Sequence, residues 1–345
     1  DHRDLHSFPT RRSSDLFDCH GLPIEQKALE ALKGGQDRDP LEIRKVCHQY
    51  ATKYIGAQTA QFKRLGVQGT WEAPYLTLDP KREADSLRLL RELVARGFVY
   101  KGMRPVYWDT VFRTALAEAE IEYGEHTSAS IFVRFRCVDW EVDRVDWVDG
   151  VDKNSRAQSD LDTSSTKSTT STASTPNFII WTTTPWTLPG NMAVCLHPDL
   201  DYVLAEVADG ERVIVAEGLL SSFCEQTGLG EPKILAKCKG AALEGLHCAH
   251  PLLEKQSLVI VGEHVTLEQG TGCVHTAPGH GADDFYVCQK YNIETVVPVD
   301  EAGKFNELYP PLQGVNVWQA NPSIIGELKT RGLLVKESKI THQYP

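Results

Sequence analysis

The sequence predicts a mixed α/β protein with a helical first part and a second part rich in β-strands. Three observations support this fold class. Apolar residues recur at helical spacing in three segments before residue 98. After residue 128 they alternate with polar residues, which is typical of half-buried strands. The length of 345 residues suffices for about two domains and a substantial core.

Each predicted helix begins at a proline and ends near a glycine, at 23–34, 40–66 and 80–97. Asp39 and Asp79 precede the second and third of these prolines, and aspartate is a favourable N-cap. Proline in the first turn and glycine past the last turn are favourable positions for these residues. We expect the three helices to flank a sheet whose strands lie mostly outside this chain.

The first predicted strand covers residues 131–137, where apolar side chains occupy every second position. Residues 202–207 and 212–216 flank Asp209-Gly210, a dipeptide typical of tight β-hairpin turns. Shorter apolar runs predict further strands at 178–181, 258–261 and 295–299, and a helix at 282–291. The second part is therefore expected to be β-rich with few helices.

The overall composition argues against some classes of function. No apolar run approaches the roughly 18 residues that a membrane-spanning helix needs, so we expect no membrane partner. The formal net charge of −11 argues against affinity that comes mainly from neutralising phosphates, although it is compatible with local nucleic-acid contacts. The nine cysteines form no CxxC pair, which favours free thiols over disulfides or a zinc site.

Two segments are expected to lie outside the folded core. Residues 1–16 have no helical or strand period and lack the apolar region of a secretory signal. They resemble translated sequencing-adapter sequence, so we expect them to be a non-native segment. Residues 149–176 are dominated by serine and threonine and have few apolar side chains to offset the entropy of ordering. We expect them to form a flexible insertion within the second domain.

Three stretches carry residues suited to chemistry, namely DCHGLPIE at 18–25, WTTTPWTLPGN at 181–191 and GTGCVHTAPGHGADD at 270–284. The first places an aspartate at the start of a helix, where an ammonium and an anion could both bind. The second is a hydroxyl-rich turn that could hold a ribose and its ester. The third could bind a metal ion or hold an ammonium with aspartate. Residue types alone leave a purely structural role open for each stretch.

Together and in this order, the three stretches resemble the isoleucyl-tRNA synthetase family, of the bacterial and organellar type, over residues 17–345. The resemblance implies an α/β fold in which a fragment of a class I synthetase Rossmann-like domain carries an inserted, barrel-like and β-rich editing domain. The implied divisions are a partial synthetic domain at 17–103, a ribbon connector at 104–125, an editing domain at 126–332 and a return toward the synthetic domain at 333–345.

This family charges tRNA(Ile) with isoleucine by using ATP and Mg²⁺, and its editing domain hydrolyses mischarged valyl-tRNA(Ile). Editing is needed because one methylene contributes only about 1–3 kcal/mol of discrimination, a general limit for which isoleucyl-tRNA synthetase is itself the standard example. The resemblance implies tRNA(Ile), isoleucine and ATP as partners of the full enzyme, no DNA partner, and no metal or cofactor for editing. It implies a location in the cytoplasm or the mitochondrial matrix.

The resemblance also implies roles for individual residues. In the editing site, one set should line the cleft for the terminal adenosine and the attacking water: Thr182, Thr183, Thr184, Thr187 and Asn191. His275 should form the wall that rejects a larger side chain, and Asp284 should pair with the α-ammonium of the valyl group. In the synthetic site, Asp18 should approach the ammonium of isoleucine, with His20 nearby.

The chain departs from the family pattern in two ways. It contains neither the HxGH motif nor a KMSKS-type loop, with which the family binds ATP phosphates, so this chain alone is not expected to form isoleucyl-adenylate. No cysteine follows Tyr107-Trp108 in the ribbon, so the zinc site of many relatives is not expected here.

Two other functions remain open. A metal-dependent hydrolase would use the histidines and aspartates of the third stretch, namely His275, His280, Asp283 and Asp284. It predicts stoichiometric metal and loss of activity with a chelator. A catalytically silent fragment that only binds tRNA ends predicts binding without turnover. The threonines of the second stretch favour editing, because neither alternative needs so many hydroxyls.

Overall fold

The computed structural model describes residues 16–32, 39–140, 145, 147–149 and 175–344. The chain divides into two compact units, Asp1–Met103 and Arg104–Pro345, each described below by itself. Of the segments expected to lie outside the core, residues 1–15 and 150–174 are outside the described residues. None of the described helices has the length and apolar character needed to cross a membrane.

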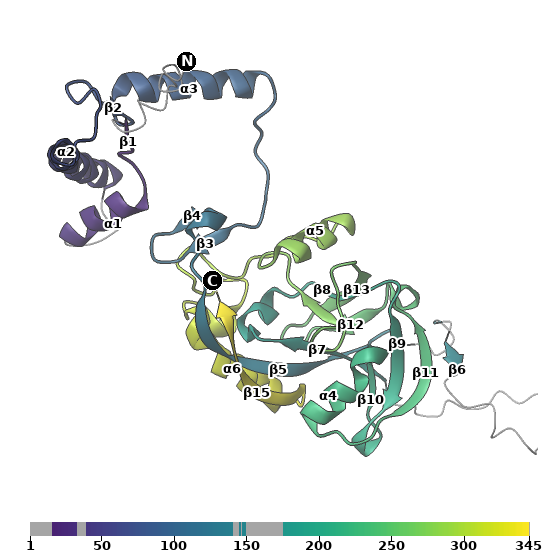
Figure 1. The fold of residues 1–345 in the computed structure, drawn as a ribbon. Coiled ribbons are helices and arrows are strands. Elements are labelled where there is room, and N and C mark those ends of the chain that lie inside the picture. Colours follow the sequence, from purple (N-terminus) through teal and green to yellow (C-terminus); the bar gives the residue numbers. More distant parts are fainter. Residues whose placement is uncertain (1–15, 33–38, 141–144, 146, 150–174, 345) are drawn as a thin grey trace, which may run out of the picture. The chain divides into compact units, whose positions relative to one another are not determined.

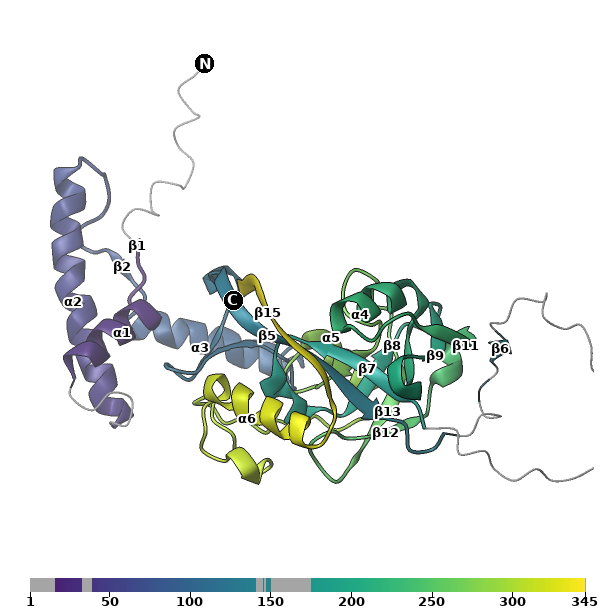
Figure 2. The ribbon, with the colours of Figure 1, turned by 90° about the horizontal axis from the view of Figure 1, so that it is seen from below.

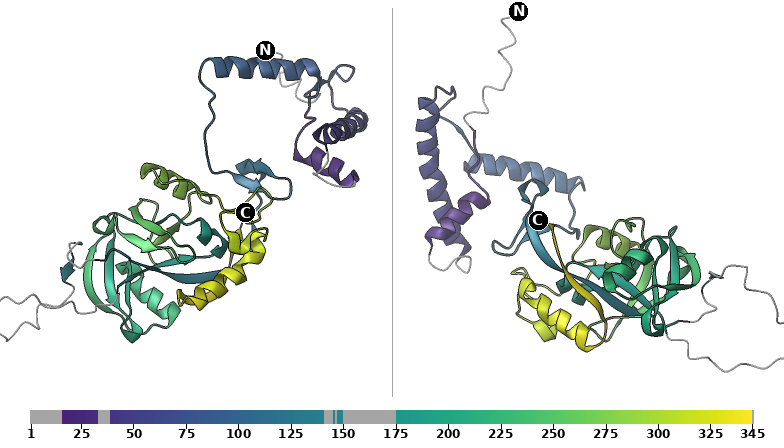
Figure 3. Two further views of the ribbon diagram at one scale, coloured as in Figure 1. Left: turned by 180° about the vertical axis from the view of Figure 1, so that it is seen from behind. Right: turned by 60° about the horizontal axis from the view of Figure 1, so that its bottom comes forward.

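Unit 1 contains the three predicted helices, which are confirmed as α1 (Leu22–Ala31), α2 (Pro40–Arg64) and α3 (Pro80–Ala95). Its only described sheet is the parallel pair of β1 (Leu16–Phe17) and β2 (Tyr75–Leu76). The Asp39 and Asp79 carboxylates cap α2 and α3 by accepting hydrogen bonds from the backbone amides two residues later, at 3.1 and 3.0 Å. Helices α1 and α2 pack against each other (Figure 3).

The core of unit 1 is small. Its described buried cluster comprises Phe17, Cys19 and Ala51, with a few half-buried side chains around them. Helix α3 buries no residue, although one of its faces carries the apolar residues Leu87, Leu90 and Val94. The apolar face of α3 is therefore not covered by any described part of unit 1.

Unit 2 is built on two larger sheets. The seven-stranded sheet has the order β15-β5-β7-β10-β9-β11-β6 and the four-stranded sheet has the order β12-β13-β8-β14. The strands of the larger sheet are β5 (Gly124–Arg136), β6 (Val148–Asp149), β7 (Asn177–Thr182), β9 (Asp201–Glu206), β10 (Arg212–Ala216), β11 (Lys233–Lys239) and β15 (Leu334–Tyr344). Those of the smaller sheet are β8 (Ala193–Leu196), β12 (His247–Ala249), β13 (Gln256–Val261) and β14 (Val274–Thr276). A separate hairpin pairs β3 (Tyr107–Asp109) with β4 (Thr114–Leu116).

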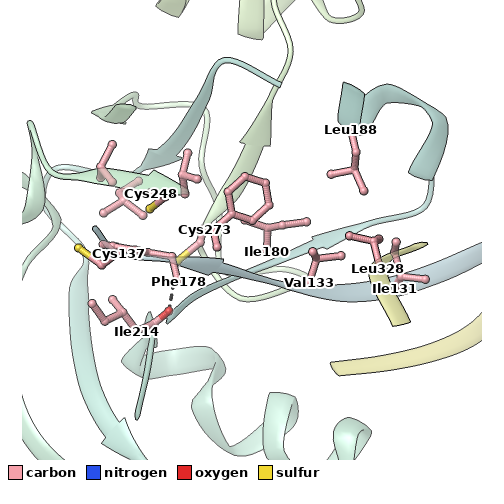
Figure 4. Packing of buried hydrophobic residues seen from close by; sticks show 14 of the residues in the cluster. Ile131, Val133, Cys137, Phe178, Ile180, Leu188, Ile214, Cys248, Cys273 and Leu328 are labelled. Carbon is pink, nitrogen blue, oxygen red and sulfur yellow. Dashed lines mark hydrogen bonds between the residues drawn. The ribbon is translucent and has the colours of Figure 1, made fainter. Parts of the chain in front are cut away.

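Three helices accompany these sheets: α4 (Leu220–Thr227), α5 (Ala282–Lys290) and α6 (Val317–Thr330). One face of the seven-stranded sheet packs against α4, and its other face packs against the four-stranded sheet and α6. The far face of the smaller sheet packs against α5. Figure 1 shows α4 and α5 on opposite sides of the two sheets, and Figure 4 shows part of the core between the sheets.

The mixed α/β class is confirmed, whereas the barrel-like arrangement is corrected. Within the described residues, the seven-stranded sheet ends at β15 and β6, which do not pair with each other. The consecutive strands β7 and β8 enter different sheets, so the chain builds two sheets instead of continuing one. The result is two open sheets packed face to face. Figure 2 shows β5 and β15 running side by side at one edge, as their antiparallel pairing requires.

The predicted hairpin at Asp209-Gly210 is confirmed. Asp209 and Gly210 have φ values of 60° and 71°, the left-handed conformations that such a tight turn needs. The helix predicted at 282–291 is confirmed as α5.

Two details of the predicted strands are wrong. Residues 295–299 form no ladder and contribute only an isolated bridge between Val299 and Phe305, because Pro298 has no N–H to donate. Strand β5 is not half-buried at its centre, because Phe132 on its second face packs against Phe223 of α4 at a ring distance of 5.6 Å. An alternating pattern does not reveal that a helix covers the second face.

Candidate functional site

A cavity of about 140 Å³ lies between the end of β7 and the start of α5. It is lined by Trp181, Thr182, Thr184, Thr187, His275, Ala277, His280 and Asp284. Strand β7 ends at Thr182, and a 3-10 helix, η6 (Pro185–Gly190), carries the chain from the larger sheet into β8 of the smaller one. Strand β14 pairs with β8 and brings His275 beside η6. The cavity therefore lies where the chain passes from the larger sheet into the smaller one.

The threonine-rich turn is held by its own hydroxyls. The Thr184 amide donates to Thr182 Oγ1 at 3.0 Å, and the Thr187 hydroxyl donates to the Thr184 carbonyl at 2.8 Å. The Trp186 amide donates to Asn321 Oδ1 of α6 at 3.0 Å, which fixes η6 from outside. Proline at the first position of η6 favours this helical turn.

His275 is held by hydrogen bonds at both ring nitrogens. Asn191 Nδ2 lies 2.7 Å from His275 Nδ1 and donates to the Ala193 carbonyl at 2.8 Å. Because a carbonyl only accepts, this atom is the amide nitrogen, and His275 Nδ1 is the acceptor. The ring proton is therefore on Nε2, which donates to Thr187 Oγ1 at 2.9 Å. Burial, followed by the nearby His280, lowers the pKa of His275 to about 3, so its ring is neutral at pH 7.

This hydrogen-bond network limits the chemical roles that are open to His275. Both nitrogens of His275 are engaged within the protein, and the Thr187 hydroxyl already accepts from His275 and donates to Thr184. His275 can therefore act as a general base or a metal ligand only if a buried hydrogen bond breaks, which is costly.

Asp284 is the half-buried carboxyl group of the cavity. It lies in the first turn of α5, and its Oδ2 accepts a hydrogen bond from the Ala277 amide at 2.7 Å. Burial raises the pKa of Asp284 to about 6, with a smaller rise from Asp283, while the Ala277 hydrogen bond opposes the shift. At pH 7 the group is mostly ionised and incompletely compensated, so it favours a cationic ligand.

His280 is a cavity residue that was expected only in the metal-site alternative. Its ring lies 5.0 Å from that of Trp186 in an edge-on arrangement, and no described group forms a hydrogen bond with its buried Nε2. Burial lowers the pKa of His280 to about 4. A Cβ on Gly190 would lie 3.0 Å from the ring, so glycine at this position makes room for it.

Most of the predicted editing residues meet in this cavity: Thr182, Thr184, Thr187, His275 and Asp284. Thr183 does not line it, because alternate side chains along an extended segment point in opposite directions. Asn191 does not line it either, since it is fully buried behind His275. Trp181 and Ala277 line the cavity without having been predicted, and their residue types carried no signal that separated them from their neighbours. His280 also lines it and was predicted only as a residue of the metal-dependent alternative.

The two residues predicted for the synthetic site lie in unit 1. Asp18 lines a cavity of about 360 Å³ between α1 and α2, and its carboxylate accepts a hydrogen bond from the Thr77 hydroxyl at 3.4 Å. His20 does not line that cavity, and its Nε2 lies 3.8 Å from Glu83 Oε1 in an exposed pair. The structure therefore brings only one of the two residues to the cavity.

The geometry does not favour the metal-site alternative. Among the residues that the structure describes, no group of three or more His, Cys, Asp or Glu side chains is arranged to hold a metal ion. His275 would have to give up a hydrogen bond to become a ligand, and Asp283 points into solvent as an exposed residue.

Curated proteins that are similar in sequence to this chain include isoleucine–tRNA ligases. An isoleucine–tRNA ligase of Syntrophomonas wolfei is 47% identical over 332 residues, which cover 95% of this chain and 32% of that relative. One of Caldanaerobacter subterraneus is 44% identical over 330 residues, which cover 95% of this chain and 33% of that relative. The chain thus spans about a third of the length of the curated relatives it matches.

A solved structure, GlLeuRS-CP1, aligns with a TM-score of 0.43 at 15% identity and covers 61% of this chain and 98% of that chain. So weak a structural likeness leaves the assignment to the sequence comparisons. A family model described as tRNA synthetases class I (I, L, M and V) matches residues 11–342. The resemblance to isoleucyl-tRNA synthetases is thereby confirmed, and this chain belongs to the class I tRNA synthetases (I, L, M and V).

Proposed function

We propose that this chain carries the editing site of an isoleucine–tRNA ligase and hydrolyses the ester of valyl-tRNA(Ile). The observation that carries the proposal is the shared cavity of the second and third stretches, which combines threonine hydroxyls with one half-buried carboxylate. Its volume of about 140 Å³ is below the roughly 300 Å³ at which drug-sized ligand pockets begin, which suits a single small side chain.

Asp284 is the group proposed to bind the α-ammonium of the aminoacyl ester. An ammonium satisfies a half-buried carboxylate whose described hydrogen bonds come from backbone amides, including that of Ala277. The pairing selects an ester with a free amine and holds its carbonyl in a fixed place, and fixed geometry lowers the barrier to attack.

The threonine hydroxyls are proposed to hold the attacking water and the ribose end of the substrate. Thr182 and Thr184 are the better candidates, because their hydroxyls lie 3.3 Å apart and each keeps hydrogen-bonding capacity for a ligand. His275 supplies shape rather than proton transfer, since its two nitrogens are engaged. The geometry assigns no general base, and Thr183 and Asn191 are proposed to act by supporting this turn.

The activities of the longer enzyme are also proposals. As a member of this family, it would activate isoleucine with ATP and Mg²⁺ and charge tRNA(Ile), with Asp18 near the ammonium of isoleucine and His20 beside it. The HxGH and KMSKS signatures that hold ATP are not among the residues of this chain. No step of activation is therefore assigned to residues described here, and the cytoplasm or the mitochondrial matrix is the proposed location.

We also propose the domain divisions that the family implies, with synthetic, ribbon and editing segments at 17–103, 104–125 and 126–332 and the return segment at 333–345. Limited proteolysis should cut near residue 104 and within 149–176 before it cuts β5, β7 or β8. Early cleavage inside those strands would contradict these divisions.

The test of function is deacylation of valyl-tRNA(Ile) and isoleucyl-tRNA(Ile) by the purified chain, with and without a chelator. Editing predicts that the valyl ester is cleaved, that the isoleucyl ester is spared, and that the chelator has no effect. Loss of activity with the chelator would support the metal-dependent hydrolase instead. Binding of tRNA without cleavage by a folded protein would support the silent fragment. Equal cleavage of both esters would remove His275 from its role as a size filter.

A further inference from the structure

Four side chains in the pocket wall and behind it form one continuous hydrogen-bond chain. Ser257 of β13 donates to Asn191 Oδ1 at 2.6 Å, and Asn191 Nδ2 donates to His275 Nδ1 at 2.7 Å. His275 Nε2 donates to Thr187 Oγ1 at 2.9 Å, and Thr187 donates to the Thr184 carbonyl at 2.8 Å. Ser257 and Asn191 are completely buried, so water does not compete for these bonds.

The direction of this chain is fixed at both ends. The Thr184 carbonyl accepts from Thr187 at one end, and the Ala193 carbonyl accepts from Asn191 Nδ2 at 2.8 Å near the other. If the Asn191 amide turned over, its oxygen would face the Ala193 carbonyl, and its nitrogen would lose that acceptor. A reversal therefore leaves buried polar atoms unsatisfied, which strongly disfavours it.

We propose that Ser257 and Asn191 are positioning residues that lock His275 as the neutral Nε2–H tautomer, so that the His275 ring offers a ligand only carbon surface. The first half of the proposal concerns the protein alone. Its consequence for substrates rests on the proposed editing function: the site takes aliphatic aminoacyl esters and discriminates against a hydroxylated side chain of the same shape.

The discrimination follows from hydrogen-bond capacity. A threonyl side chain has nearly the shape of a valyl one. Its hydroxyl, however, loses its hydrogen bonds with water on entering the pocket and needs a partner there to replace them. Both nitrogens of His275 already have partners, and the only proton of the Thr187 hydroxyl is bound to Thr184. On this side of the cavity, only the second lone pair of Thr187 Oγ1 is left for a ligand hydroxyl. An apolar wall rejects such an isostere only modestly, so we expect valyl-tRNA to be cleaved about 10- to 100-fold faster than threonyl-tRNA.

The lock can be measured without any substrate. Nitrogen-15 NMR of histidine-labelled protein should show His275, assigned by its absence in His275→Gln, with a protonated Nε2 and an unprotonated Nδ1. Its signal should not titrate between about pH 6 and 8, since burial lowers its pKa to about 3. A protonated Nδ1, or titration in this range, would overturn the proposal.

Asn191→Asp is the sharpest variant, because a carboxylate only accepts hydrogen bonds. It should force a proton onto His275 Nδ1 and reduce the preference for valyl over threonyl esters toward onefold. Asn316→Asp makes the same charge change at the N-cap of α6, where Asn316 Oδ1 accepts from the Trp318 amide at 3.0 Å. Aspartate caps helices equally well, so this control should leave both the His275 tautomer and the preference for valyl over threonyl esters unchanged.

Ser257 provides a second variant in case Asn191→Asp fails to fold. Ser257→Ala leaves the Asn191 oxygen without its donor, and should give His275 a second, minor tautomer signal. Ser257→Thr keeps the hydroxyl and should restore the single signal. A single unchanged signal in folded Ser257→Ala would remove Ser257 from the lock.

The tautomer of His275 and the preference for valyl esters can be contradicted separately. If no ester is cleaved while His275 shows the expected tautomer, the lock stands and the editing function fails. If valyl and threonyl esters are cleaved equally by the wild-type chain, editing stands and the selective role of this wall is wrong.

Discussion

The two units of this chain differ in how completely they bury their apolar side chains. In unit 2, both faces of the seven-stranded sheet are covered, and residues such as Leu328 of α6 are completely buried. In unit 1, α3 buries nothing, and its Leu89 is 64% exposed. Burial of apolar surface is the main driving force of folding, so unit 2 has a core of its own and unit 1 has only a small one.

The difference extends to the candidate residues in each unit. Asp284 and His275 of unit 2 are held by buried hydrogen bonds from neighbouring strands and loops. Asp18 and His20 of unit 1 are exposed, and their described contacts at 3.4 and 3.8 Å are long. A catalytic pocket depends on rigid placement, so only the pocket in unit 2 is preorganised by the described residues.

Hydrogen exchange should show the largest contrast between the units. Backbone amides of β7, β8 and β13 should be protected about 1,000-fold or more above those of α3, because protection in a stable core approaches the global stability. Mass-spectrometric exchange of the whole chain measures both units in one sample. Equal protection in α3 and in these strands would break the comparison.

A matched pair of leucine substitutions should show the next largest effect. Leu328→Ala removes a completely buried side chain and should lower the free energy of unfolding of unit 2 by about 2–5 kcal/mol. Leu89→Ala removes a side chain that is 64% exposed and should change stability by no more than about 0.5 kcal/mol. Urea unfolding followed by circular dichroism compares the two variants. A large loss in Leu89→Ala would mean that α3 is covered in solution.

A matched pair of aspartate substitutions tests the preorganised pocket. Asp284→Asn keeps the shape but removes the half-buried charge, and should slow valyl-tRNA deacylation about 30-fold or more, as expected when one partner of a buried charge pair is lost. Asp283→Asn changes the neighbouring exposed carboxylate and should leave the rate nearly unchanged. If Asp283→Asn were as slow as Asp284→Asn, the result would support the metal-dependent hydrolase, which uses both aspartates.

The pH dependence of deacylation tests whether the charge of Asp284 is needed. Asp284, with a pKa of about 6, must be ionised to bind the ammonium, so the rate should fall about tenfold per pH unit below this value. An α-amino group loses its proton near pH 8, so the rate relative to uncatalysed hydrolysis should also fall above that pH. Asp284→Asn should lack the acidic limb, and an acidic limb that persisted in it would assign the titration to another group.

The same shift makes a prediction about stability. The pKa of Asp284 in the folded protein is above its ordinary value of 3.8, so the folded state holds this proton more tightly than the unfolded state. Its contribution to stability is therefore lost as the pH rises from about 4 through 6. Thermal unfolding should show that Asp284→Asn gains stability over the wild type at pH 7 but not at pH 4.

Residues at the ends of helices and in tight turns predicted the positions of several elements correctly. Asp39 and Asp79 mark the starts of α2 and α3, and Asp209-Gly210 marks the β9–β10 turn, because capping and left-handed turns depend on neighbours in sequence. The periodic pattern failed at residues 295–299, where a single proline prevents a ladder.

The candidate site was predicted in part for a related reason. Thr182 and His275 belong to stretches that are distinctive in residue type, and both line the cavity. His280 was singled out only for the metal-dependent alternative, and Ser257 carried no signal, since a lone serine is common anywhere in a chain. His280 contacts Trp186, which is 94 residues earlier in the sequence, and Ser257 contacts Asn191, which is 66 residues earlier. Both pairs meet only after folding.

The sequence by itself determined the family, the mixed α/β class, the helices of unit 1 and most residues of the pocket, because these depend on motifs and on neighbours along the chain. Only the tertiary structure decided that β7 and β8 enter different sheets, which opens the cavity between them. It alone decided that Asn191 stands behind His275 and fixes its proton. The physical reason is that burial and hydrogen-bond direction are properties of groups that meet only after folding.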